Sequence, residues 1–214
     1  MVGRGKEILP MIRIVDYGLG NIQAFMNVFN LLGLPALRAR KPEDLADATR
    51  LILPGVGAFD HGMQLLNQSG LRDPLEAMVI GRKVPILGVC VGMQMLACAS
   101  DEGTVPGLNW IPGRVLAFAD RPELAKLPVP HMGWNDLQVK SDSILFTNLE
   151  PQPRFYFLHS YFFDCDQKAD VASTAFYGLQ FDCAVSKGHI HGVQFHPEKS
   201  HRFGAQLLKN FASF

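Results

Sequence analysis

The chain has 214 residues, 48% of them hydrophobic, which suits one domain with a sizeable core and is short for two. Its 20 basic and 20 acidic residues cancel, so charge gives no reason to expect a nucleic acid or a membrane surface as partner. No apolar stretch reaches membrane-spanning length, and the N-terminus lacks the apolar segment of an export signal. The four cysteines form no C-x-x-C pair, which favours free thiols in a reducing compartment, and we expect a cytoplasmic protein.

Strand and helix patterns alternate through the first half of the chain, after residues 1–10, which we interpret as an N-terminal extension and a candidate disordered segment. In chain order, we expect a strand at 12–15, a helix at 21–32 ending at Gly33, a strand at 51–53, a helix at about 71–80, a strand at 83–89 and a helix starting near Met93. This order predicts an α/β fold, a mainly parallel open sheet covered by helices, as a single domain over 11–214.

The middle of the chain, from about residue 111 to 185, is richer in strand and turn signals and is expected to be an added strand-rich region. A strand is then expected at 190–195, with His196 at its end, and an amphipathic helix over 200–214.

A single cysteine lies between two glycines in "ILGVCVGMQML", residues 86–96, where the strand pattern changes to a helix pattern. A sharp strand-to-helix turn needs positions without a Cβ, and Gly88 and Gly92 supply them on either side of Cys90. Such an elbow presents a nucleophile at the top of an α/β sheet, where a helix N-terminus favours a thiolate. Cys98, Cys165 and Cys183 are interpreted as small apolar residues.

A candidate base lies in "GVQFHPEKS", residues 192–200. Glu198 follows His196 by two residues, so its carboxylate can hold one imidazole nitrogen while the other faces a thiol. The alternative is a solvated surface turn. Together with the cysteine elbow, the pair predicts a Cys90–His196–Glu198 triad for acyl transfer.

Acyl transfer also needs hydrogen-bond donors for the developing oxyanion. The backbone N–H of Val91, directly after the nucleophile, is one candidate. A second donor is expected from Val56 or Gly57 in the glycine-rich "LPGVGAF", residues 53–59, and the sequence leaves open which amide points inward.

These motifs carry a family resemblance. "GVCVGMQML", "LPGVGAFDHGM" and "GVQFHPEKS" resemble the class I glutamine amidotransferases, and "PHMGWN" with "FYFLHSY" narrows the resemblance to glutaminase subunits of imidazole glycerol phosphate synthase. The similarity runs from about Met11 to Phe214, with the motifs in the same order. It implies a subunit that hydrolyses glutamine and passes ammonia to a barrel-shaped cyclase/synthase in a heterodimer, without a cofactor or a metal.

The resemblance also assigns roles to residues. Cys90, His196 and Glu198 match the family triad. The positions that hold glutamine in the family match Gln94, Glu102, Ser160 and Tyr161. The positions that face the synthase match Tyr156, Met132, Trp134, Asn135 and Lys199. The "HMGWND" stretch has no clear strand or helix period, so we expect Trp134 to lie outside the core.

Several alternatives compete with this interpretation. "DYGLGNIQA", residues 16–24, is close to a dinucleotide-binding turn, but arginines stand in the next strand region where an acidic residue is expected. His189, His191 and His196 are a weak metal candidate, because no cysteine or carboxylate spacing completes a site. A catalytically dead interaction subunit is disfavoured by the complete triad. Within the family, "KSHRFGAQLLKNF", residues 199–211, somewhat resembles paralogous glutaminases that serve sugar amidation in surface-polysaccharide synthesis.

Overall fold

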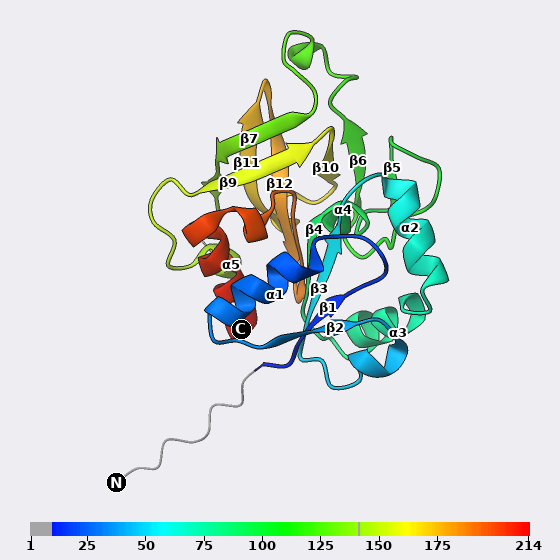
Figure 1. Ribbon diagram of the computed structural model, residues 1–214. Helices are drawn as coiled ribbons and strands as arrows, with labels where there is room; N and C mark the ends of the chain where they lie inside the picture. The colour runs from blue at the N-terminus through cyan, green and yellow to red at the C-terminus, as the bar shows by residue number, and fades with distance from the viewer. Residues whose placement is uncertain (1–9, 141) are drawn as a thin grey trace.

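The computed structural model describes residues 10–140 and 142–214. Its first half alternates strands and helices around a sheet (Figure 1). In order these are β1 (Ile12–Val15), α1 (Ile22–Leu31), β2 (Ala36–Ala39), β3 (Arg50–Gly55), α2 (Phe59–Gln68), α3 (Arg72–Glu76) with a following π turn (Ala77–Gly81), β4 (Ile86–Cys90) and α4 (Val91–Gln94). The predicted parallel α/β arrangement is therefore confirmed.

The second half supplies more strands and the last helix. They are β5 (Ala99–Ser100), β6 (Gly113–Ala117), β7 (His131–Asp136), β8 (Gln138–Val139), β9 (Arg154–His159), β10 (Tyr161–Cys165), β11 (Val171–Tyr177), β12 (Leu179–Lys187), β13 (Ile190–Val193) and α5 (His201–Ser213). Short 3-10 turns at Pro42–Leu45, Pro122–Leu124, Ile144–Phe146, Lys168–Asp170 and Pro197–Lys199 join them.

The main sheet has the order β2-β1-β3-β4-β13-β12-β10-β6-β5, with β11 pairing β12 and β8. The strands from β2 to β13 along this order are parallel, whereas β12 and β10 continue it antiparallel. From β1 the chain crosses to β2 at the edge of the sheet, whereas from β3 it crosses to β4 toward the centre, in the opposite direction along the sheet. Because crossovers are right-handed, α1 and the α2–α3 segment cover opposite faces (Figure 1).

The strand-rich middle region joins this same sheet, except for β7 and β9. These two strands pair antiparallel in a separate two-stranded sheet, which lies across the β11 and β12 end of the molecule in Figure 1. It brings β7 and β9 near the carboxyl ends of β3, β4 and β13, where ligands of open α/β sheets bind.

Several expectations about elements were wrong or incomplete. The strand predicted at 190–195 ends at Val193, so His196 lies beyond it, at the start of a 3-10 turn. The stretch around Trp134 is strand β7, whose inward positions hold a histidine, a glycine and an asparagine, so no apolar alternation is visible. Strand β2 was anticipated only as a strand region near Arg38 and Arg40 without bounds, and helix α2 was not predicted.

Helix α2 was missed although its buried residues, Phe59, Met63 and Leu66, follow helical spacing. It has no side-chain cap from its own N-terminus. Instead, the Phe59 N–H donates to Glu102 Oε2 at 2.8 Å, from a loop 43 residues later. A capping partner so distant in sequence gives no local start signal.

The helix after the elbow is shorter than predicted, because α4 ends at Gln94. The carbonyls of Met95 and Leu96 accept hydrogen bonds from Leu108 and Trp110 of the next loop, at 2.8 and 2.9 Å. Tertiary hydrogen bonds thus replace the helical ones that would have continued α4.

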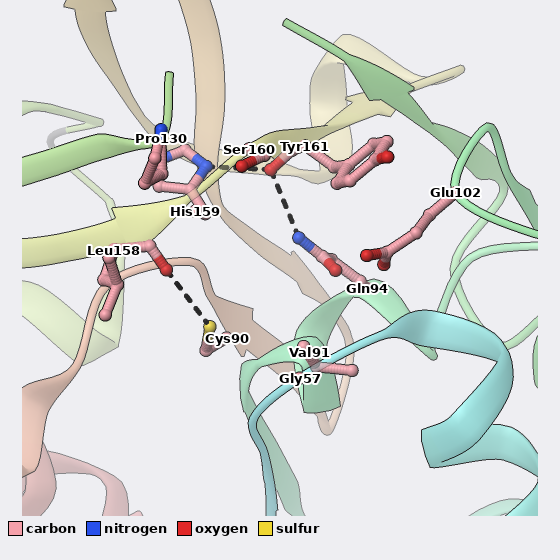
Figure 2. A pocket seen from close by; sticks show the side chains of 10 residues that line it. All are labelled: Gly57, Cys90, Val91, Gln94, Glu102, Pro130, Leu158, His159, Ser160 and Tyr161. Carbon is pink, nitrogen blue, oxygen red and sulfur yellow. Dashed lines mark hydrogen bonds between the residues drawn. The ribbon is translucent and has the colours of Figure 1, made fainter. Parts of the chain in front are cut away.

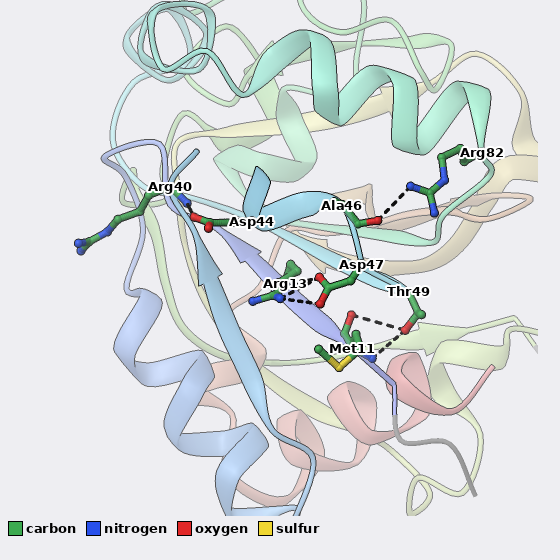
Figure 3. A network of polar contacts seen from close by, with 8 residues as sticks. All are labelled: Met11, Arg13, Arg40, Asp44, Ala46, Asp47, Thr49 and Arg82. Carbon is green, nitrogen blue, oxygen red and sulfur yellow. Dashed lines mark hydrogen bonds and ion pairs between the residues drawn. The ribbon is translucent and has the colours of Figure 1, made fainter. Parts of the chain in front are cut away.

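Polar contacts join the start of β1 to the segment that precedes β3 (Figure 3). Arg13 forms a bidentate ion pair with Asp47 at 2.8 and 2.9 Å, and Met11 N donates to Thr49 Oγ1 at 2.8 Å. The Asp47 side chain is half exposed, so this pair contributes little stability.

Nine of the largest fully buried side chains are phenylalanines, which come from both halves of the chain. No helix among the described residues is long and apolar enough to span a membrane. Residues 1–9 of the predicted N-terminal extension lie outside the described residues.

Candidate active site

Cys90 is the last residue of β4 and directly precedes α4. Its φ is +56°, in the left-handed region that a cysteine rarely adopts. The two glycines of the motif permit this turn. A Cβ on Gly92 would overlap the Leu53 carbonyl, and one on Gly88 would lie 2.5 Å from the Gly92 oxygen. Close packing at Gly88 and Gly92 thus holds Cys90 in its strained backbone conformation, and strain of this kind is common at functional sites.

The predicted triad residues lie together. The His196 and Glu198 side chains are 3% and 2% exposed, and Nδ1 of the imidazole lies 2.8 Å from Glu198 Oε1. Because Nδ1 pairs with the carboxylate, Nε2 is the nitrogen left for the Cys90 thiol. Burial lowers the pKa of His196, but hydrogen bonds with Cys90 and Glu198 raise it by more, to about 9.

The other cysteines differ from Cys90 in their surroundings. Burial raises the pKa of the Cys165 thiol to about 11 and that of Cys183 to about 12, with no imidazole beside either. Cys98 is part-buried, with its sulfur 3.0 Å from the Gly113 carbonyl. Only Cys90 is paired with a histidine, so it is the cysteine suited to nucleophilic chemistry.

A cavity of about 240 Å³ opens in front of Cys90 (Figure 2). Most of the residues predicted to hold glutamine or an oxyanion line it. The lining consists of Gly57, Cys90, Val91, Gln94, Glu102, Pro130, Leu158, His159, Ser160 and Tyr161. Val56 is not among them, and its side chain is 40% exposed just after β3. His196 and Glu198 are also not among the lining residues.

Two buried amides connect Cys90 to the wall of the cavity. Gln94 Nε2 donates to the Tyr161 carbonyl at 3.2 Å and to Gln194 Oε1 at 3.0 Å. Gln194 Nε2 in turn lies 3.8 Å from Cys90 Sγ. Gln194 was not predicted as a site residue. It is fully buried directly after β13, and a polar side chain within the apolar "GVQF" was the signal that could have identified it.

Glu102 is placed from the opposite side of the cavity. Its carboxylate accepts from Phe59 N, and its loop is held by Asp60, which accepts from Thr104 and Val105 N–H groups at 2.9 and 3.0 Å. Burial raises the pKa of Glu102, the Phe59 N–H opposes that rise, and the Asp60 charge adds to it.

The glycine-rich loop after β3 lies against the elbow. A Cβ on Gly55 would lie 2.5 Å from Gly92 N, and Gly57 has a φ of +94°. Tyr17 fixes the base of the loop, because its buried hydroxyl donates to the Pro54 carbonyl at 2.8 Å. The "DYGLGNIQA" segment therefore packs against this loop.

The sequence comparisons agree with this geometry. The family described as glutamine amidotransferase class-I matches residues 14–213. The chain is 58% identical over 202 residues to the imidazole glycerol phosphate synthase subunit HisH of Bdellovibrio bacteriovorus, covering 94% of this chain and 99% of that one. It belongs to the class I glutamine amidotransferases.

Other relatives of this amidotransferase point the same way. HisH of Leptospira interrogans is 49% identical over 203 residues, covering 95% of this chain and all of the relative. A solved glutamine amidotransferase has the same fold, with a TM-score of 0.71 at 20% identity, over 94% of this chain and 96% of that one. The amidotransferase is thus an enzyme of the HisH type, and neither the dinucleotide oxidoreductase nor the sugar-amidation alternative is favoured.

The outer side of the β7–β9 sheet carries exposed apolar side chains beside the cavity. Met132, Trp134 and Leu158 are 66%, 41% and 38% exposed, and Leu158 also lines the cavity. Lys199 Nζ lies 6.0 Å from the centre of the Tyr156 ring. We call these five residues the docking face. Asn135 differs, because its amide turns inward and donates to the Phe176 carbonyl at 2.9 Å.

The histidines of the metal alternative are not gathered at one point. His189 Nε2 contacts the Val79 carbonyl at 2.7 Å, His191 Nδ1 contacts Ser186 Oγ at 2.6 Å, and His196 is held by Glu198. Within residues 10–140 and 142–214 there is no cluster of three histidine, cysteine or acidic side chains suited to a metal ion.

Proposed function

We propose that the amidotransferase hydrolyses glutamine to glutamate and ammonia through a thioester on Cys90, and that it delivers the ammonia to a barrel-shaped cyclase/synthase subunit that makes imidazole glycerol phosphate in histidine biosynthesis. One observation carries the hydrolytic part. A cysteine at a strained elbow faces a cavity and contacts a buried histidine that a carboxylate holds, with a histidine pKa of about 9.

Each triad residue has its own role in the proposed chemistry. The Cys90 thiolate attacks the side-chain amide carbon of glutamine, and the His196 imidazolium protonates the nitrogen that departs as ammonia. Water then attacks the thioester with His196 as base, which releases glutamate. Glu198 keeps the Nδ1 proton in place and stabilises the imidazolium.

The remaining cavity residues bind the substrate and the oxyanion. The Val91 N–H and a second N–H from Val56 or Gly57 are the proposed oxyanion donors. Gln94, Glu102, Ser160 and Tyr161 are the proposed glutamine-binding residues, since all four line the cavity. The Glu102 carboxylate is suited to the substrate's ammonium group.

The partner proposal rests on the docking face. Free ammonia in water near neutral pH is mostly ammonium, which has no nucleophilic lone pair, so a delivering enzyme gains from covering its site with the acceptor enzyme. Apolar side chains that continue directly into the cavity fit this arrangement. The residues predicted to face the partner all lie on β7, on β9 or beside these strands; they are Tyr156, Met132, Trp134, Asn135 and Lys199. We therefore propose a heterodimer, located in the cytoplasm, where the four free thiols stay reduced.

Growth of a histidine auxotroph tests the function. The amidotransferase, co-expressed with the synthase subunit of its own genome, should restore growth of a strain that lacks both subunits when ammonium is scarce. The matched Cys90→Ser pair should restore growth only when ammonium is abundant. Failure of the unaltered pair at any ammonium concentration, with both proteins soluble, would refute the histidine assignment and favour sugar amidation.

A further inference from the structure

Two buried histidines that hydrolysis does not use lie on β7 and β9, and the second of them lines the cavity. His131 and His159 are directly opposite each other in the β7–β9 pair, and they are 3% and 5% exposed. His131 Nδ1 lies 2.9 Å from His159 Nε2. A nitrogen-to-nitrogen hydrogen bond between two rings needs one donor and one acceptor, so the protons on both rings are fixed by their other partners.

The cavity end of the pair fixes the first proton. His159 Nδ1 lies 2.8 Å from the Tyr161 carbonyl oxygen. Figure 2 marks this hydrogen bond with a dashed line. A carbonyl only accepts, so His159 must carry its proton on Nδ1, and its Nε2 is the acceptor in the neutral ring. It follows that His131 donates from Nδ1, which leaves His131 Nε2 as an acceptor.

The other end of the pair fixes the same direction independently. Asn135 Nδ2 lies 3.3 Å from His131 Nε2, and its orientation is set by two backbone groups. Nδ2 donates to the Phe176 carbonyl at 2.9 Å, and Oδ1 accepts from Asp136 N at 2.8 Å. The Asn135 amide therefore presents a donor to His131, as the cavity end requires.

The surroundings keep both rings neutral. His131 stacks on Tyr177 and Phe157 at 4.2 and 4.9 Å between ring centres, and the Phe118 ring centre lies 5.2 Å from that of His159. Burial in these aromatic walls lowers the pKa of His131 to about 4 and that of His159 to about 3. The chain of donors therefore has one direction, from Asn135 to the Tyr161 carbonyl.

The Tyr161 carbonyl then connects the pair to the reacting centre. It also accepts from Gln94, which bonds Gln194, whose amide contacts Cys90. One polar chain thus joins β7, the strand that carries Met132 and Trp134, to the nucleophile. A buried network of this kind defines one geometry only while every member is satisfied.

We propose that His131 and His159 are positioning residues. Through the hydrogen-bond chain that starts at Asn135 on β7, the strand of the docking face, they fix the position of the Tyr161 carbonyl and thereby that of Gln94. The proposal rests on the proposed function, because it assigns these residues to the glutamine cavity. Their role is to hold this carbonyl, and the proposed hydrolysis moves no proton through them.

The tautomers provide a direct test. In protein labelled with ¹⁵N-histidine, spectra near pH 7 should show two neutral rings with the proton on Nδ1, and His131→Asn and His159→Asn should assign them by removing each in turn. A proton on Nε2 of either ring, or a doubly protonated ring at this pH, would overturn the proposal.

Glutamine affinity tests the positioning role. In a Cys90→Ser background, calorimetry on the full chain should show about tenfold weaker glutamine binding for His131→Leu, the effect expected for loss of one buried hydrogen bond. His131→Asn has the same shape as His131→Leu but keeps a donor at the δ position, so it should bind within about twofold of the parent. Equal affinities in the two variants would contradict the proposal, because both lose the same ring volume.

Asn135→Ala extends the test from outside the cavity and serves if His131→Leu does not fold. It should weaken glutamine binding about threefold, with no further loss when combined with His131→Leu. The matched control is Asp136→Asn on the same strand, which should change nothing. Unchanged affinity in Asn135→Ala refutes the coupling, whereas a Cys90→Ser parent that binds no glutamine refutes the proposed function instead.

Discussion

Replacement of Trp134 by alanine tests the docking face most sharply. The indole is 41% exposed and stacks on His201 with 5.4 Å between ring centres and 8° between planes, so it is already held in one orientation. A fully buried tryptophan removes up to roughly 250 Å² from water. The exposed share is therefore roughly 100 Å², and its burial by a partner contributes about 2.5 kcal/mol at about 25 cal/mol per Å².

A loss of about 2.5 kcal/mol raises the Kd for the synthase about 70-fold. Surface plasmon resonance or calorimetry with the purified synthase subunit measures this, and thermal unfolding of the free amidotransferase measures the cost to folding. We expect the melting temperature to change by only a few degrees, because the ring lies on the outside of a two-stranded sheet.

Leu37→Ala is the matched control. Leu37 is 47% exposed, close to Trp134 in exposure, but lies on β2 at the far edge of the main sheet. Its replacement should leave the synthase affinity unchanged. A large fall in the melting temperature of Trp134→Ala, with normal affinity of the folded protein, would show that the ring supports the fold and would refute the docking argument.

Four further predictions concern the catalytic centre and the elbow that holds it. Cys90→Ser should abolish glutamine hydrolysis in the complex but leave synthesis from added ammonium salts intact; glutamate release at the parental rate would exclude Cys90 as nucleophile. Because the pKa of His196 is raised to about 9, its proton is held below that pH and lost above it, so kcat/KM should fall as pH rises through about 9. Glu198→Gln removes one of the groups that raise this pKa, so the alkaline limb should move to lower pH with a smaller loss of activity than in Cys90→Ser; a limb that stays in place would count against the pair. Gly92→Ala should cost about 3 kcal/mol or more in urea unfolding, since its Cβ meets the Leu53 carbonyl, whereas Gly81→Ala, with open space at that position, should cost nothing; similar values for both would disprove the packing argument.

The sequence by itself determined the parts of the protein that depend on near neighbours in the chain. The glycines around Cys90 predicted the elbow because only they allow the close approach of strand and helix backbones there. The two-residue spacing of His196 and Glu198 predicted their hydrogen bond, since that distance is set by the local backbone. Hydrophobic periodicity likewise predicted most of the parallel strands and most helices of the first half.

Only the tertiary structure decided what depends on residues far apart in the sequence. Helix α2 begins where a glutamate 43 residues later caps it, and α4 ends where a later loop takes its carbonyl partners. Strand β7 could not be predicted because its inward residues are a histidine, a glycine and an asparagine. The two polar side chains are satisfied there by His159 and by the Phe176 carbonyl. Hydrogen bonds to distant partners leave no periodicity in the sequence, and for this reason the connection from β7 to the nucleophile becomes visible only in the folded chain.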